Sequence, residues 1–133
     1  HETIVIFDDF NDFIFNRCKD IICKFGGNNF NLNIADMWIN AYEEGDYASE
    51  HYHPGSDYSC CYYVDLEGDP SPIVFPPELE IIPKNNMLIL FDSRILHSIP
   101  PSTSRRINIA MNFNLSPIKN KITNKIPNNV SYS

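Results

Sequence analysis

From residue 28 onward, short groups of turn-forming residues divide the chain into brief segments. The groups combine Gly, Pro, Asn, Asp and Glu and fall at residues 44–45, 54–55, 68–70, 76–77, 85–86 and 100–101. The segments between them are rich in apolar residues or alternate between apolar and polar, which is typical of strands. We predict strands over residues 36–43, 47–53, 58–65, 72–75, 79–82, 87–91, 94–99 and 105–115. Eight short strands punctuated in this way favour a mainly β fold, a small jelly roll or double-stranded β-helix.

One helical pattern precedes the strands, over residues 8–25. Apolar side chains recur there at steps of three and four residues, which predicts a helix with one apolar face. Asp8 and Asp9 are candidate N-caps, and Gly26-Gly27 provides the stop. We expect this helix to pack against the outside of the jelly roll, because its apolar face needs a partner.

The chain contains no internal repeat and no low-complexity linker, so we interpret residues 1–133 as one domain. Residues 116–133 are polar and rich in Asn, and we expect a loose tail or a strap on the barrel. The chain has 10 Lys and Arg against 17 Asp and Glu, a net charge of −7. This balance argues against nucleic acid and anionic membranes as partners. The apolar runs, such as residues 87–91, are too short to span a bilayer.

Cysteine usage indicates a reducing compartment. The four cysteines are Cys18, Cys23, Cys60 and Cys61, and no Cys-x-x-Cys motif is present. Cys60 and Cys61 are adjacent in a predicted strand, so their side chains point to opposite faces. Reduced thiols in a cytoplasmic protein are favoured over a disulfide framework or a zinc site.

Three histidines form the pattern that carries most chemical information. His51 and His53 are two residues apart near the end of a predicted strand, and His97 lies in a later one. Residues i and i+2 of a strand face the same side, so the pair is able to aim at one point. Three converging imidazoles that leave open positions suit iron(II), manganese, nickel or zinc. The alternative is that His51 and His53 are exposed rim residues and His97 is a core histidine.

The last predicted strand has one polar and one apolar face. Its polar row consists of Arg106, Asn108, Ala110 and Asn112, and its apolar row of Ile107, Ile109, Met111 and Phe113. A polar row inside a barrel is suited to hold an acid, and an arginine is able to bind a carboxylate with two parallel hydrogen bonds. Arg105 is adjacent to Arg106, so its side chain points to the opposite face of the strand. The alternative is that the polar row is a solvated outer face.

These residues resemble the iron(II)- and 2-oxoglutarate-dependent oxygenases, most closely the prolyl-hydroxylase-like branch. The resemblance spans residues 36–113 and includes the His-x-His pair, the distal histidine, and an arginine nine residues after that histidine. It also includes Tyr42-x-x-Gly45 ahead of the first histidine, the strand Tyr62-Tyr63-Val64, and the segment from Pro83 to Phe91.

The resemblance implies an Fe(II) site formed by His51, His53 and His97. It also implies that 2-oxoglutarate binds this metal, with Arg106 and Tyr63 on its far carboxylate. Tyr42 would line the cosubstrate or substrate pocket, and Asn108 belongs to the same cosubstrate-facing set. Molecular oxygen would be consumed, a small molecule or a prolyl or peptide substrate hydroxylated, and succinate and CO2 released.

One residue departs from the family pattern. The second metal ligand of most such oxygenases is an aspartate, whereas this chain has His53, and Asp57 lies close enough in sequence to replace it. A neutral imidazole in place of a carboxylate leaves one more positive charge on the metal site.

Two other interpretations remain open at this point. Gly45 followed by His51-x-His53 also fits the first motif of a metal-binding cupin, which would be an isomerase, a dioxygenase without cosubstrate, or a sugar-binding module. His97 comes too late after Pro83 for the second cupin motif, and Arg106 favours the oxygenase. The other interpretation is a jelly-roll binding protein whose site has decayed.

Overall fold

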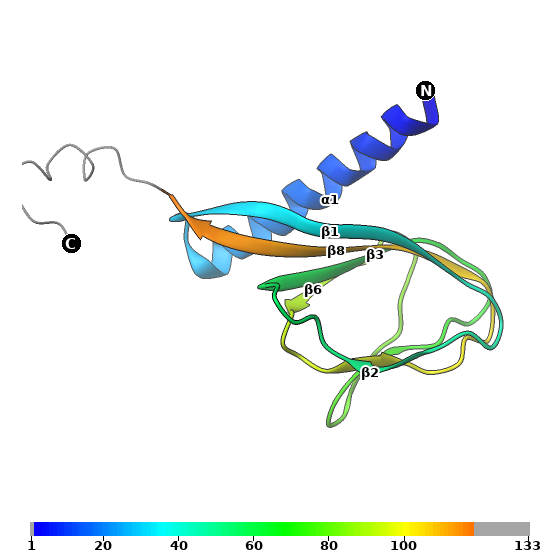
Figure 1. Cartoon of the computed structure of the whole chain (residues 1–133). Helices are drawn as coiled ribbons and strands as arrows, with labels where there is room; N and C mark the ends of the chain where they lie inside the picture. Colours follow the sequence, from blue (N-terminus) through cyan, green and yellow to red (C-terminus); the bar gives the residue numbers. More distant parts are fainter. Residues whose placement is uncertain (1, 119–133) are drawn as a thin grey trace, which may run out of the picture.

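The computed structural model of the chain describes residues 2–118, which form one helix followed by eight strands (Figure 1). The elements are α1 (Glu2–Gly26), β1 (Phe30–Tyr42), β2 (Ala48–His51), β3 (Tyr58–Leu66), β4 (Ile73–Phe75), β5 (Leu79–Ile81), β6 (Leu88–Asp92), β7 (His97–Ile99) and β8 (Arg106–Pro117). Each predicted strand is present, so the mainly β prediction is confirmed. No helix among the described residues is long and apolar enough to cross a membrane.

The boundaries of the helix and the first strand differ from the prediction. The helix starts at Glu2, so Asp8 and Asp9 lie inside it and are not N-caps. Its first turns contain the β-branched run from Thr3 to Ile6, which disfavours a helix in a sequence-based prediction. β1 starts at Phe30 rather than at residue 36.

The end of the last strand also differs. β8 continues to Pro117, so residues 116 and 117 belong to this strand rather than to a tail. The predicted tail or strap from residue 119 onward lies outside the described residues.

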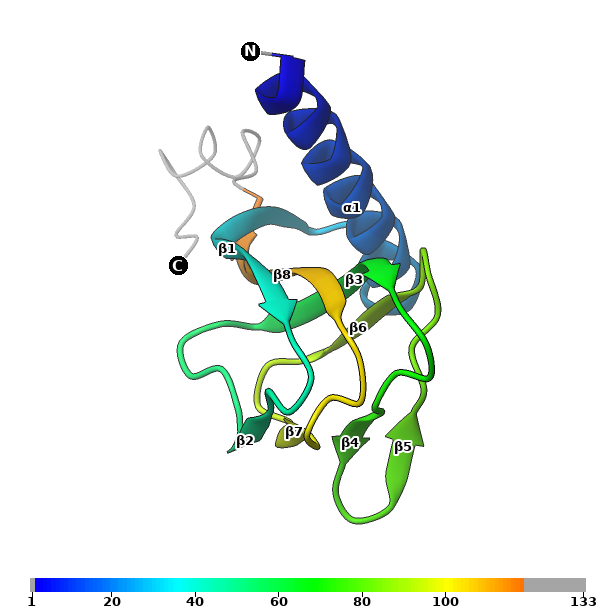
Figure 2. The ribbon, with the colours of Figure 1, turned by 90° about the vertical axis from the view of Figure 1, so that its right-hand side faces the viewer.

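The strands of residues 2–118 form two four-stranded sheets, in the orders β1-β8-β3-β6 and β2-β7-β4-β5. Every strand pairing within them is antiparallel. Figure 2 shows the two sheets as layers, with the first sheet between the helix and the second sheet. This order is that of an eight-stranded jelly roll, so the predicted double-stranded β-helix is confirmed.

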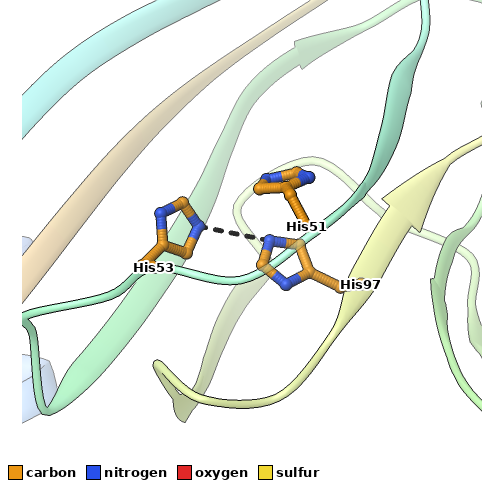
Figure 3. A group of neighbouring side chains, drawn as sticks. All are labelled: His51, His53 and His97. Atoms are coloured by element: carbon orange, nitrogen blue, oxygen red, sulfur yellow. Dashed lines mark hydrogen bonds between the residues drawn. The ribbon is translucent and has the colours of Figure 1, made fainter.

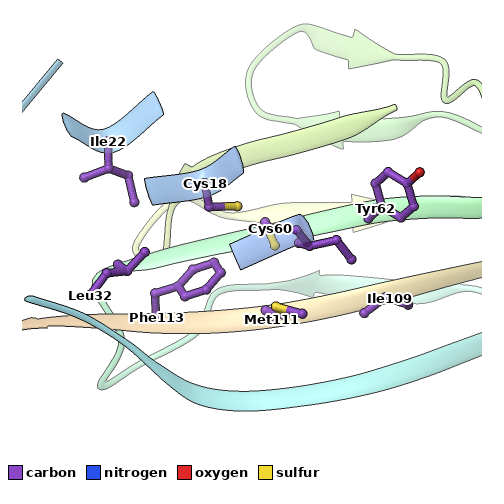
Figure 4. Close-up of a cluster of buried hydrophobic side chains, with 9 residues drawn as sticks. Cys18, Ile22, Leu32, Cys60, Tyr62, Ile109, Met111 and Phe113 are labelled. Atoms are coloured by element: carbon purple, nitrogen blue, oxygen red, sulfur yellow. The ribbon is translucent and has the colours of Figure 1, made fainter. Parts of the chain in front are cut away.

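Helix α1 covers the outer face of the first sheet, as expected. Its buried residues Ile14, Cys18 and Ile22 pack on side chains from three strands (Figure 4). The strand side of this cluster consists of Leu32, Cys60, Tyr62, Ile109, Met111 and Phe113. The apolar row predicted for β8 therefore faces the helix, and its polar row faces the interior of the jelly roll.

A second apolar cluster lies between the two sheets. Its members are Cys61, Tyr63, Ile73, Phe75, Ile89 and Ile99. Cys60 belongs to the helix-facing cluster and Cys61 to this one, so the two adjacent thiols point to opposite faces as predicted. The four cysteines of the chain all lie in the described part and are free thiols.

The polar row of β8 is buried inside the jelly roll. Arg106 is 1% exposed, and Asn108, Ala110 and Asn112 are buried with it. Arg105 lies immediately before the strand, is half-exposed, and forms an ion pair with Glu43 at 3.5 Å. The predicted difference between the two adjacent arginines is therefore confirmed.

Candidate metal centre

Two strands and a loop bring His51, His53 and His97 together (Figure 3). His51 is the last residue of β2 and pairs with His97, the first residue of β7. His53 lies two residues beyond the end of β2, which corrects the expectation that both histidines of the pair are on one strand. Pro54 and the left-handed Gly55 that follow it turn the chain away from the sheet.

The spacing of the imidazoles fits one metal ion. The donor nitrogens of the three rings all lie within 4.8 Å of one another, and Nε2 of His53 is 3.2 Å from Nε2 of His97. Two imidazole nitrogens bound at right angles to one ion at about 2.1 Å are separated by about 3 Å. The His53–His97 separation is therefore close to that of neighbouring ligands on one metal.

Main-chain carbonyls orient two of the rings. Nδ1 of His51 donates to the carbonyl of Ser49 at 2.6 Å, and Nδ1 of His97 donates to the carbonyl of Ile95 at 3.0 Å. A carbonyl only accepts, so in both rings Nδ1 carries the proton. Nε2 then carries the lone pair that a metal would bind. Metal-binding histidines in proteins are usually held by such a hydrogen bond on the second ring nitrogen.

Burial also favours the neutral form of two of the imidazoles, those of His53 and His97. It lowers the pKa of His97 to about 4, and the neighbouring His51 and His53 lower it as well. Burial and the nearby His51 lower the pKa of His53. The ring of His97 packs against Phe91, with ring centres 4.8 Å apart. Neutral imidazole is the form that binds metal, so neither His53 nor His97 needs to lose a proton before it could bind a metal near pH 7.

Asp57 lies outside this group. Its carboxylate Oδ2 accepts a hydrogen bond from the Leu115 main-chain N–H at 2.7 Å, and its own N–H donates to the carbonyl of Phe113 at 2.8 Å. Asp57 thus ties the loop after His53 to β8. Of the two candidates for the second ligand, His53 is the one that approaches the other histidines.

A cavity of about 140 Å³ extends from the three histidines between the two sheets. Tyr42 and Asn108, two of the residues expected to face a cosubstrate, line it. Trp38 and Asn40 line it too. They precede Tyr42 at alternate positions of β1, and alternate residues of a strand share a face, so the sequence spacing alone could have placed them beside Tyr42. Tyr63 is fully buried and lies with Arg106 just beyond the Tyr42 end of the cavity.

Arg106 is buried without an acidic partner. Nη1 donates to the carbonyl of Ser71 at 2.8 Å, whereas Nε and Nη2 have no hydrogen-bond partner. The ion pairs found within residues 2–118 involve Arg94 and Arg105 and not Arg106. The guanidinium carbon lies 5.3 Å from the ring centre of Tyr42 and 5.4 Å from that of Tyr63. A buried cation with two free donors fits a carboxylate-bearing ligand, which would compensate the cost of burial.

The two tyrosines next to Arg106 are neutral. Burial raises the pKa of both Tyr42 and Tyr63, and the opposing effect of the nearby Arg106 charge is smaller. A neutral phenol is a hydrogen-bond donor as well as an acceptor. The Oδ1 atom of Asn108 is also buried without a partner. This end of the cavity therefore offers several polar atoms to a ligand.

The fold is shared with oxygenases and cupins. A 2OG-Fe(II) oxygenase-family oxidoreductase from Burkholderia pseudomallei superposes with a TM-score of 0.59 at 13% identity, covering 74% of this chain and 52% of that one. A prolyl hydroxylase from Trichoplax adhaerens, in complex with a hypoxia inducible factor peptide fragment, gives 0.57 at 18% identity over 75% and 54%. A cupin superfamily protein from Desulfitobacterium hafniense gives 0.50 at 11% identity over 65% and 79%.

No protein-family model matches the sequence, and no curated protein does either. The resemblance to the 2-oxoglutarate oxygenases, including prolyl hydroxylases, is thus confirmed at the level of the fold. The chain spans about half the length of the first two proteins described above.

Sequence reasoning missed the residues that act through their main chain. The carbonyl of Ser71 accepts from Arg106, and those of Ser49 and Ile95 orient two imidazoles. Every residue type has such a carbonyl, so no sequence signal could have identified these three.

Proposed function

We propose that this chain is an Fe(II)- and 2-oxoglutarate-dependent dioxygenase that hydroxylates a small molecule or a prolyl or peptide substrate. His51, His53 and His97 would hold the metal. Arg106, Tyr63, Tyr42 and Asn108 would form the cosubstrate end of the cavity. When bound, Fe(II) and 2-oxoglutarate supply oxidation by O2, with one oxygen atom entering the substrate and the other entering succinate as CO2 leaves.

The observation that carries this proposal is the unpaired guanidinium of Arg106. It lies just beyond the Tyr42 end of the cavity that the three converging imidazoles also line, with its guanidinium carbon 5.3 Å from the ring centre of Tyr42. The Nε–Nη2 edge of an arginine is a fork that matches the two oxygens of a carboxylate. A dicarboxylate with a metal-binding group at its opposite end satisfies both ends at once, and 2-oxoglutarate is such a molecule.

The surrounding residues have distinct tasks in this proposal. Ser71 occupies Nη1 of Arg106, which leaves the Nε–Nη2 edge for the ligand. The neutral phenols of Tyr42 and Tyr63 lie beside the guanidinium, and their hydroxyls would be further donors to the same carboxylate. Phe91 and Phe75 lie against His97 and exclude water from behind the metal site.

The test is whether the protein converts 2-oxoglutarate to succinate. Purified protein with Fe(II), ascorbate and O2 should form succinate from 2-oxoglutarate, slowly without a primary substrate and faster with one. The His97→Ala variant is the matched control and should form none. Succinate formation equal in both proteins would refute the proposal.

A cupin-type metal protein that does not use 2-oxoglutarate is the second candidate. The all-histidine ligand set and the cupin neighbour with 79% of its length covered favour it. This candidate predicts stoichiometric metal binding without any effect of 2-oxoglutarate on the metal spectrum, which the same preparation would reveal.

A further inference from the structure

One turn between β6 and β7 contacts two of the three histidines. The carbonyl of Ser93 accepts a hydrogen bond from the main-chain N–H of His53 at 2.9 Å. Two residues later, the carbonyl of Ile95 accepts from Nδ1 of His97 at 3.0 Å. His53 lies beyond the end of β2, so its position depends on loop contacts of this kind rather than on strand pairing. The turn therefore links the two imidazoles whose Nε2 atoms are 3.2 Å apart.

A buried chain of polar side chains anchors this turn to the first sheet. Ser93 is 0% exposed, Ser59 on β3 is 2% exposed, and Asn112 on β8 is 5% exposed. The hydroxyl of Ser59 donates to Oδ1 of Asn112 at 2.7 Å. A hydroxyl has one proton, so in the 2.8 Å contact between the two serines Ser93 is the donor. The hydrogen bonds therefore run in one direction, with Ser93 donating to Ser59 and Ser59 donating to Asn112.

Ser93 also holds the far end of the His53 loop. Its main-chain N–H donates to the carbonyl of Asp57 at 3.1 Å, while its carbonyl holds His53. Both ends of residues 53–57 are therefore fastened to one residue. Within the turn, Asp92 accepts two hydrogen bonds from the Arg94 side chain, at 2.6 and 3.0 Å.

We propose that Ser93 is a positioning residue for the metal centre. Its hydroxyl, held by Ser59 and Asn112, fixes the turn whose carbonyls set His53 and His97 at the separation that one metal ion requires. A buried hydroxyl that lost this partner would leave polar atoms unsatisfied, so the turn has one favourable arrangement. The inference rests on the proposed metal site and is independent of whether 2-oxoglutarate is used.

Cobalt(II) alone is a suitable probe, because its visible absorption reports both affinity and ligand geometry. The Ser93→Ala and Ser59→Ala variants should each bind Co(II) about 10- to 100-fold more weakly, the usual effect of losing an outer contact that orients a ligand. The Co(II) affinity of the double variant should equal that of whichever single variant binds Co(II) more weakly, because both substitutions break the same series of hydrogen bonds. Ser102→Ala is the matched control, since Ser102 is buried in the β7–β8 loop and its hydroxyl has no hydrogen-bond partner.

Hydrogen exchange of the metal-free protein provides a second measurement. The His53 amide should exchange faster in Ser93→Ala, whereas the Asp57 amide, which donates to Phe113, should remain protected. Unfolding curves in urea separate a local effect from a loss of fold, and Ser59→Ala replaces Ser93→Ala if the latter does not fold.

The inference is overturned if folded variants bind Co(II) like the parent, or if the two single effects multiply in the double variant. Succinate formation by the parent decides the dioxygenase function separately. A parent that forms no succinate but shows the coupled loss of Co(II) affinity rejects that function and supports the role of Ser93. A parent that binds no Co(II) rejects both.

Discussion

Replacing Arg106 tests the proposed cosubstrate site most directly. Arg106→Ala removes the buried guanidinium whose Nε and Nη2 have no partner in the protein. It should abolish tight binding of 2-oxoglutarate while leaving Fe(II) binding intact, because Arg106 takes no part in the hydrogen bonds that hold the three histidines. Arg105→Ala is the matched control, since Arg105 is half-exposed and paired with Glu43.

The magnitude follows from the two free donors. A hydrogen bond to a charged group contributes about 1.5–3 kcal/mol, so two of them contribute roughly 3–6 kcal/mol. Moving the ligand carboxylate out of water offsets part of this gain, so we expect a loss near the lower end. About 3 kcal/mol corresponds to an increase of about a hundredfold in the dissociation constant of 2-oxoglutarate. Arg106→Lys should recover part of this, because an ammonium does not form the paired fork.

The assay is an anaerobic titration of 2-oxoglutarate into the Fe(II)-loaded protein, followed by the visible charge-transfer band of the complex. Iron content and thermal unfolding are measured on each variant, so that weaker binding is not confused with a loss of metal or fold. An Arg106→Ala variant that binds 2-oxoglutarate like the parent would refute the assignment. Loss of binding in Arg105→Ala alone would show that the carboxylate is held outside the barrel.

Three further predictions concern the metal and the core. His97→Ala should abolish stoichiometric Fe(II) binding in a folded protein, as measured by a colorimetric iron assay, and unchanged iron content would exclude His97 as a ligand. His53→Leu should weaken iron binding whereas His53→Asp should retain it; equal affinity of His53→Leu and the parent would mean that another group fills the position. Phe113→Ala removes a fully buried ring under α1 and should lower the free energy of unfolding by about 3–5 kcal/mol in urea denaturation, so a change below 1 kcal/mol would contradict the packing described.

Periodicity predicted which side chains of β8 share a face, because apolar residues occupy one face of this strand and mostly polar residues the other. On β8 the residues Ile109, Met111 and Phe113 all meet the helix, and Arg106 and Asn108 alternate with them. A shift of one residue would have turned Asn108 and Asn112 toward the helix, so the register was strongly determined. The separation of Cys60 and Cys61 follows from the same rule.

Local propensity explains the errors at the boundaries. Asn31 and Asn33 have low β propensity, which hid the strand formed by the first residues of β1. There, pairing with β8 outweighs propensity: Asn31 pairs with Ser116 and Asn33 with Asn114. The contacts of Ser93 with His53 and Ser59 join residues more than thirty positions apart, and a serine in a turn gives no signal for such a task.

The ligand set also bears on the charge of the whole site. Three neutral imidazoles leave both positive charges of a divalent ion uncompensated, whereas an aspartate ligand would cancel one of them. The proposed all-histidine site would carry one net positive charge, because the divalent metal and Arg106 together exceed the two negative charges of bound 2-oxoglutarate by one. The chain as a whole carries −7, and the carboxylate of Asp36 acts on His53 by raising its pKa against the effect of burial. In the proposed site, the negative charge that an aspartate ligand would place in the coordination sphere would come only from a distance, where it is weaker and screened by salt. His53→Asp moves that charge onto the metal, so this single substitution separates the geometric role of His53 from its electrostatic one.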